Sequence, residues 1–243
     1  MSKGLVSRKA LYNVTKRTDE EHKSIFSKRR EDPSKTFFIC GRSYTGKTHF
    51  LVSELNKLTD EHQCCKLPWK LRPVYDLILF MTESLDADPV KNLDKSLPIL
   101  IIRGYNQRVI LLLKKIQDAS SRGFRFLVVL DDIIDELRSN TVRKQILTLR
   151  NSHISTCIVA QYPKLITPSM RNSIHEWYIT GLKPEEYEYL LSGFLASHAR
   201  DVVGNIKSSS VLAYEFKDFI GSDILFFSQR EDKMGLIKRA KWE

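Results

Sequence analysis

The chain has 243 residues, of which 42% are hydrophobic and 28% are charged, a balance typical of a globular protein with one large domain or two small ones. Lysine and arginine outnumber the acids by 39 to 29, so the net charge is +10. This excess favours a polyanionic partner such as DNA, RNA or an acidic surface, although solubility alone could also explain it. No apolar run approaches the ~20 residues of a membrane-spanning helix, and the N-terminal region lacks the apolar core of a signal peptide, so we expect an intracellular protein.

Three regions follow one another along the chain. Residues 1–32 are polar and basic and predict an N-terminal arm, 33–200 predict the core, and 201–243 predict a C-terminal extension with added strand and a basic tail. Apolar runs that read as strands lie at 37–40, 74–82, 99–102, 124–130, 156–160, 176–180 and 224–227. Segments that read as helices lie at 47–58, 106–121, 133–149, 168–174 and 185–197. The alternation predicts an α/β fold with a mostly parallel sheet between helices, because strands buried on both faces are continuously apolar.

The first strand is followed by a pattern that predicts a phosphate-binding loop. This loop consists of Gly41, Arg42, Ser43, Tyr44, Thr45, Gly46, Lys47 and Thr48. Its glycines let the backbone curl so that several N–H groups face one anion, and the helix that follows adds its positive end. Lys47 is then expected to bind the β- and γ-phosphates of ATP, and the Thr48 hydroxyl to bind Mg²⁺.

Two acids end the strand 124–130. In a parallel sheet the carboxyl end of this strand opens beside the phosphate-binding loop, so we assign Asp131 to the metal and Asp132 to the attacking water. The alternative is that one of them caps a helix that begins near 133. At least one strand and helix separate the acids from the loop, which distinguishes this order from the simplest kinase-like arrangement.

Three more polar residues are candidates for the same site. Gln161 ends the strand 156–160, which we expect to lie between the two nucleotide-binding strands, so its side chain is predicted to face the γ-phosphate; it could also be a turn residue. Arg150 precedes this strand and Arg171 follows it. Either arginine is a candidate to stabilise the γ-phosphate of a neighbouring subunit, with a surface salt bridge as the alternative.

Several of these segments resemble the DNA-packaging ATPases of large and medium double-stranded DNA viruses, poxvirus type, in the FtsK/HerA superfamily. The resemblance covers residues 36–196 and is carried by 39–48, 127–132, 149–153, 158–161 and 170–173. It departs from the family at Asn151, where the family pattern has histidine after the arginine. It implies a RecA-like fold with an additional strand, and a homo-oligomeric ring, a pentamer or hexamer, that hydrolyses ATP with Mg²⁺ at its subunit interfaces. The hydrolysis would drive translocation of double-stranded DNA into a preformed capsid.

The same resemblance implies partners and a location. The partners would be double-stranded DNA and a component of the capsid vertex or portal, and the location the viral factory of the host cytoplasm or the virion. The alternative functions are a nucleotide-binding structural adaptor and a nucleoside or nucleotide kinase. A kinase would need a base-recognition pocket and an arginine-rich lid, and the sequence offers neither near the predicted strand ends.

Overall fold

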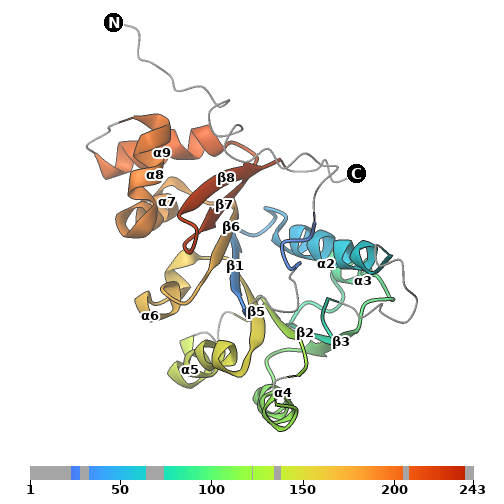
Figure 1. Ribbon diagram of the computed structural model, residues 1–243. Helices are drawn as coiled ribbons and strands as arrows, with labels where there is room; N and C mark the ends of the chain where they lie inside the picture. Colours follow the sequence, from blue (N-terminus) through green and yellow to red (C-terminus); the bar gives the residue numbers. More distant parts are fainter. Residues whose placement is uncertain are drawn as a thin grey trace, which may run out of the picture.

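The computed structural model describes residues 23–27, 33–63, 74–121, 123–133, 138–204 and 208–238. Its centre is an eight-stranded sheet with the order β3-β2-β4-β5-β1-β6-β7-β8 (Figure 1). The strands are β1 (Thr36–Gly41), β2 (Leu77–Thr82), β3 (Ile99–Arg103), β4 (Phe126–Asp131), β5 (Ile154–Ala160), β6 (Glu176–Gly181), β7 (Ile224–Ser228) and β8 (Lys233–Ile237). The predicted strands are therefore present, with ends that differ by a few residues.

The order of the strands places β5 between β1 and β4. β5 pairs in parallel with β1 on one side and with β4 on the other, so the carboxyl ends of all three strands meet at one edge. β2, β3 and β6 continue the parallel sheet, whereas β7 is antiparallel to β6 and β8 is antiparallel to β7. The expected mostly parallel α/β architecture is confirmed, with an antiparallel hairpin added at one end.

Helices cover both faces of the sheet because successive strand residues point to opposite sides. In β4, Leu127 and Val129 pack toward α2 (Lys47–Gln63) and α3 (Asp88–Lys91), and Val128 and Leu130 pack toward the other face. The helices of that other face are α4 (Gln107–Ala119), α5 (Asn140–Leu149), α6 (Pro168–Arg171), α7 (Pro184–Leu190), α8 (Ala196–Val203) and α9 (Ser209–Ile220). Both faces are apolar, which explains the unbroken apolar runs in the sequence.

The described part of the N-terminal region packs on the core. Ile25 and Phe26 are buried, and Phe26 meets Phe37 of β1 edge to face with ring centroids 5.1 Å apart. The backbone is fixed there, because Ile25 N donates to Glu54 Oε2 at 2.8 Å and the Tyr75 hydroxyl donates to Phe26 O at 2.9 Å. Residues 23–27 thus add to the hydrophobic core, and the rest of the predicted arm lies outside the described residues.

Two helices differ from their predictions. α5 begins at Asn140 after the N-cap Ser139, and not near 133, so neither acid at the end of β4 caps it. The helix expected at 185–197 is longer and contains the π-helical segment Leu191–Leu195 between α7 and α8. Among the residues that the structure describes, no helix is long and apolar enough to cross a bilayer.

Candidate functional site

The loop after β1 turns sharply beside β6. Gly41 has no room for a side chain, because a Cβ there would overlap the hydroxyl of Thr180 and lie 2.6 Å from that of Thr45. Gly46 has a φ of 78°, in the left-handed region that glycine adopts without strain, and Tyr44 adopts a φ of 63° at the fully exposed tip. The loop leads directly into the first turn of α2, so its N–H groups and the helix N-terminus converge on one place.

Lys47 lies on this first turn and reaches back into the loop. Its Nζ donates to Arg42 O at 3.0 Å, and only 9% of the residue is exposed. Burial lowers the pKa of Lys47, and the charges of Asp132 and Asp131 oppose that change. The ammonium group and the two carboxylates therefore share one electrostatic environment, as the sequence predicts.

Asp131 is a buried carboxylate with one uncommitted oxygen. It continues the β4 face that packs against α2, and 2% of its surface is exposed. Thr82 Oγ1 donates to Oδ2 at 3.3 Å, whereas Oδ1 has no hydrogen-bond partner among the described residues. Burial, and then the charge of Asp132, raise the pKa of Asp131 to about 7. A buried oxygen without a donor is suited to a cation.

The chemistry of the donors can be compared with that of Mg²⁺. Mg²⁺ takes oxygen ligands, and in phosphate-binding loops one hydroxyl and one carboxylate complete a shell of water and phosphate oxygens. Thr48, half-buried beside Lys47 on α2, offers the hydroxyl, and the unpaired Oδ1 of Asp131 offers the carboxylate. The residues present fit this ion.

Asp132, Gln161 and Ser43 form a hydrogen-bonded chain across the edge of the sheet. Gln161 Nε2 donates to the two carboxylate oxygens of Asp132 at 3.1 and 3.3 Å, and Ser43 Oγ donates to Gln161 Oε1 at 3.2 Å. Asp132 itself has a φ of 58°, in the left-handed region that few non-glycine residues adopt and that aspartate and asparagine adopt more often than most. The chain links the ends of β4 and β5 to the phosphate-binding loop.

Two threonines at strand ends belong to the same edge, and the sequence analysis did not single them out. Thr82 supports Asp131, and Thr180 of β6 shares a hydrogen bond of 2.8 Å with Thr45 in the loop. The available signal was their position, since each is the polar residue that ends an apolar strand. That position places a side chain at the carboxyl edge of a parallel sheet.

The two candidate arginines lie in different surroundings. Arg171 Nη2 donates to the Tyr189 hydroxyl at 2.5 Å, and its guanidinium lies 4.9 Å from the centre of the Tyr189 ring. A Cβ on Gly193, in the π-helical segment, would come within 2.5 Å of Arg171 Nη1, so Arg171 is enclosed by its own subunit. Arg150 is exposed on a 3₁₀ turn before β5, at the amino edge of the sheet and away from the loop of its own chain.

The strand order, with the glycine-bent loop and the two acids at the carboxyl edge of the sheet, defines a P-loop NTPase of the RecA-like, additional-strand type. A family model for the poxvirus A32 protein matches residues 25–207, and the chain belongs to this family. The resemblance to poxvirus-type packaging ATPases is confirmed in family and fold. Comparison with curated proteins gave no match.

Solved structures of viral and bacterial ATPases share the fold. The DNA-packaging ATPase B204 of Sulfolobus turreted icosahedral virus superposes with a TM-score of 0.58 at 11% identity, over 86% of this chain and 98% of that one. B204 of Sulfolobus turreted icosahedral virus 2, in complex with ATPγS, gives 0.54 at 11% identity, over 85% and 98%. EssC (ATPases 2 and 3) of Geobacillus thermodenitrificans gives 0.52 at 11% identity, over 86% of this chain and 41% of that one.

Proposed function

We propose that the chain is a Mg²⁺-dependent ATPase that moves double-stranded DNA into a preformed capsid. The observation that carries the proposal is the buried Asp131, whose free Oδ1 shares an electrostatic environment with Lys47 at the carboxyl edge of the sheet. An unpaired buried carboxylate is costly, and a cation with bound nucleotide would relieve that cost. Membership of the poxvirus A32 family and the likeness to B204, described as a DNA-packaging ATPase, support the assignment.

Each residue of the edge takes a role in this proposal. The amides of the loop 41–48 and the Lys47 ammonium hold the β- and γ-phosphates. Thr48 and Asp131 would hold Mg²⁺, which neutralises phosphate charge when it is bound. Asp132 orients and deprotonates the attacking water, and Gln161 holds the Asp132 carboxylate through two hydrogen bonds. Ser43 donates to the oxygen of the Gln161 amide. A γ-phosphate that displaced Ser43 would therefore move the Asp132 carboxylate through these hydrogen bonds.

A ring of five or six copies would complete each site with an arginine from a neighbour. Arg150 is the better candidate, since it is exposed and forms no ion pair within the described residues, whereas Arg171 would have to leave Tyr189. A guanidinium at the γ-phosphate stabilises the charge that develops during phosphoryl transfer. Hydrolysis would then occur only at a formed subunit interface, which would couple the chemistry to the geometry of the ring.

The DNA contacts would be made to phosphates, because a packaging motor accepts any sequence. The exposed Lys95, Arg103 and Arg108 are candidates, together with the basic ends of the chain. Arg103 faces Asp86 at 3.6 Å, and both side chains are largely exposed, so this pair holds Arg103 only weakly. A capsid vertex or portal component would be the docking partner, in the viral factory of the host cytoplasm or in the virion.

The test is phosphate release from ATP, with and without duplex DNA, together with the mass of the protein in solution. The proposal expects turnover that DNA stimulates and an oligomer of five or six copies. No turnover in either condition would favour a structural adaptor that only binds nucleotide. Turnover that responds to a phosphate acceptor, and not to DNA, would favour a kinase.

Two substitutions separate binding from chemistry. Lys47→Ala should abolish turnover and weaken ATP binding, because the cation that holds the β- and γ-phosphates is lost; unchanged turnover would remove this assignment. Asp132→Asn should retain ATP and lose turnover. If Asp132→Asn still hydrolyses ATP, the base is another acid, such as Asp135 or Glu136, which lie outside the described residues.

A further inference from the structure

A cavity lies at the amino edge of the sheet, opposite the phosphate-binding loop. Its volume is about 410 Å³, and it is lined by Pro33, Ser34, Arg150, His153, His175 and Arg230. The topology explains this gathering, because these residues immediately precede β1, β5 and β6 or follow β7. β7 runs antiparallel to β6, so the turn after β7 returns to the edge where the parallel strands begin.

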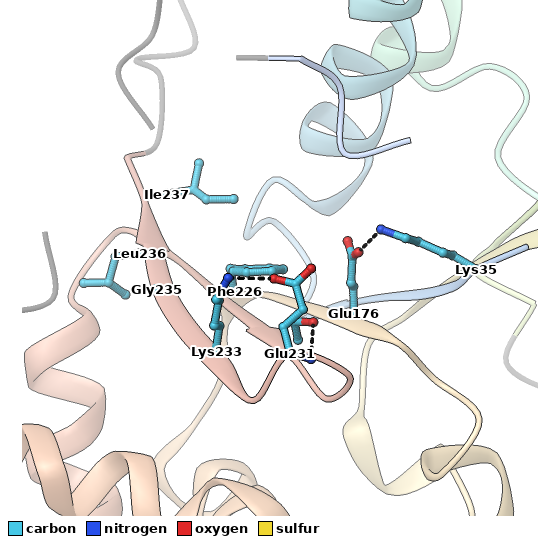
Figure 2. Close-up of a pocket in the computed structure, with 9 residues that line it drawn as sticks. Lys35, Glu176, Phe226, Glu231, Lys233, Gly235, Leu236 and Ile237 are labelled. Carbon is cyan, nitrogen blue, oxygen red and sulfur yellow. Dashed lines mark hydrogen bonds and ion pairs between the residues drawn. The ribbon is translucent and has the colours of Figure 1, made fainter. Parts of the chain in front are cut away.

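The lining of this cavity, here called the amino-edge pocket, is strongly basic. It contains two arginines and two histidines, and no carboxylate among the described residues lines it. A cavity of about 210 Å³ beside β8 offers a contrast (Figure 2). There each lysine is paired with a glutamate, Lys35 with Glu176 at 2.6 Å and Lys233 with Glu231 at 3.1 Å. Within the described residues, Arg150 and Arg230 form no such ion pair.

The backbone holds His175 and Arg230 in place. His175 N donates to Thr36 O at 2.8 Å, and Gln229 N donates to His175 O at 2.9 Å, so the residue before Arg230 is tied to His175. Thr36 N also donates to His175 Nδ1 at 2.9 Å. In the neutral imidazole the proton therefore lies on Nε2, which makes Nε2 a donor and not an acceptor.

Two observations indicate that an anion belongs in the amino-edge pocket. Ser34 is 5% exposed, and its Oγ has no hydrogen-bond partner among the described residues. A buried hydroxyl without a partner is costly, and a ligand oxygen that accepts from it would relieve that cost. Burial and the charges of Arg150, Lys35 and Arg230 lower the pKa of His175, while Glu176 opposes them. Burial is the largest of these causes and would not itself attract an anion, but the positive charges of Arg150, Lys35 and Arg230 would.

We propose that the amino-edge pocket binds one phosphate group, held by Arg150 and Arg230 with hydrogen bonds from His175 Nε2 and Ser34 Oγ. Guanidinium groups bind phosphate oxygens through parallel N–H bonds, and imidazole and hydroxyl donors complete the tetrahedral set. The phosphate belongs either to duplex DNA or to a nucleotide on a neighbouring copy, since both present the same oxygens. The pocket exists in the isolated chain and does not depend on ATP hydrolysis.

The first experiment measures inorganic phosphate binding to the full chain with Lys47→Ala, which disables the nucleotide loop. Histidine ring signals are followed by NMR, and the His175 signal is assigned with His175→Gln. Phosphate should shift this signal and raise the pKa of His175, because a bound anion favours the imidazolium. Arg230→Gln should weaken phosphate binding by roughly 10- to 100-fold, the size of one charged hydrogen bond.

A matched control removes an arginine elsewhere. Arg200→Gln, at an exposed position on α8, should leave phosphate binding unchanged. Equal phosphate affinity in Arg230→Gln and the Lys47→Ala parent would overturn the proposal. An unmoved His175 signal at saturating phosphate would do so as well. Neither result depends on ATP turnover. Failure of the phosphate-binding proposal can therefore be told apart from failure of the proposed ATPase function.

The second experiment identifies the source of the phosphate. If the group belongs to duplex DNA, Arg230→Gln should lower DNA affinity and reduce the slope of log affinity against log salt by about one. If the group belongs to a neighbour's nucleotide, DNA binding stays unchanged and the ATP concentration for half-maximal turnover rises. Each outcome supports the pocket and names its ligand.

Discussion

Replacing Asp131 by asparagine should stabilise the nucleotide-free protein at neutral and alkaline pH. The carboxylate is buried with one oxygen unpaired, and the pKa is raised from 3.8 to about 7. The folded state therefore binds this proton more tightly than the unfolded chain does. This tighter proton binding adds to the free energy of unfolding. The added stability is fully present below pH 3.8, declines as the pH rises, and is lost above about pH 7.

The size of the effect follows from the pKa difference. A rise of about three units, at 1.36 kcal/mol each, corresponds to about 4 kcal/mol as an upper value. The asparagine of Asp131→Asn cannot ionise. Its amide oxygen can still accept from the Thr82 hydroxyl, which in the parent donates to Asp131 Oδ2. The variant should match the parent near pH 4 and exceed its unfolding free energy by up to about 4 kcal/mol at pH 8.

The assay is urea denaturation between pH 4 and pH 8.5 with a chelator present, since a bound cation would favour the carboxylate. Asp118→Asn, at an exposed position on α4, is the control and should change stability by less than about 0.5 kcal/mol at every pH. In a protein that keeps Asp131, Asp132→Asn should lower the pH at which this added stability is lost, because the charge of Asp132 helps to raise the Asp131 pKa. A constant difference between Asp131→Asn and the parent would refute the reasoning.

Three further substitutions test other parts of the structure. Gly41→Ala should abolish nucleotide binding, measured with a fluorescent ATP analogue, because the new Cβ would overlap the Thr180 hydroxyl and displace the loop. Phe26→Ala should lower the unfolding free energy by about 3–5 kcal/mol in urea denaturation, since this ring is fully buried. Mixing Arg150→Ala subunits with Lys47→Ala subunits should restore part of the ATPase turnover, because an intact loop and an intact arginine then meet at some interfaces.

Each of these three predictions has a control and a contrary result. Gly204 has a φ of 94°, so Gly204→Ala strains the backbone, but the new Cβ would meet no neighbouring atom; this variant controls for strain far from the loop and should retain nucleotide. A Gly41→Ala protein that binds ATP normally would contradict the steric argument. Tyr214→Ala removes an exposed ring and should lower the unfolding free energy only slightly. If Phe26→Ala lowered it no more than Tyr214→Ala does, the packing of residues 23–27 would be contradicted. Arg171→Ala replaces Arg150→Ala in a parallel mixture. Recovery only with Arg171→Ala would transfer the trans role to that residue.

The arrangement of the carboxyl edge of the sheet was largely predictable from the sequence, because it depends on local order along the chain. Glycine spacing at 41 and 46 requires a particular backbone, and continuous apolar runs require buried strands. Once parallel strands are expected, residues at their carboxyl ends must converge, which brings Asp131 and Lys47 together. The position of β5 between β1 and β4 follows the same logic and is confirmed.

Other features required the packed chain. No local pattern shows that Arg171 lies against Tyr189, or that Ser34 Oγ has no hydrogen-bond partner among the described residues, because each depends on segments far apart in sequence. The amino-edge pocket joins four such segments and could not be read from any of them. The burial of Phe26 was missed because two apolar residues in a polar stretch do not make a helical or strand period.

The sequence by itself determined the glycine-bent loop after β1, the position of the two acids at the end of β4 and the class of sheet, because these features depend on residue type and on strand direction. Within the part of the chain that the structure describes, the tertiary structure decided which oxygen of Asp131 is free, which arginine is exposed, and where positive charge gathers without a counter-ion. Burial and charge pairing are sums over neighbours from many segments. They are set when the segments pack, and no single stretch of the chain contains them.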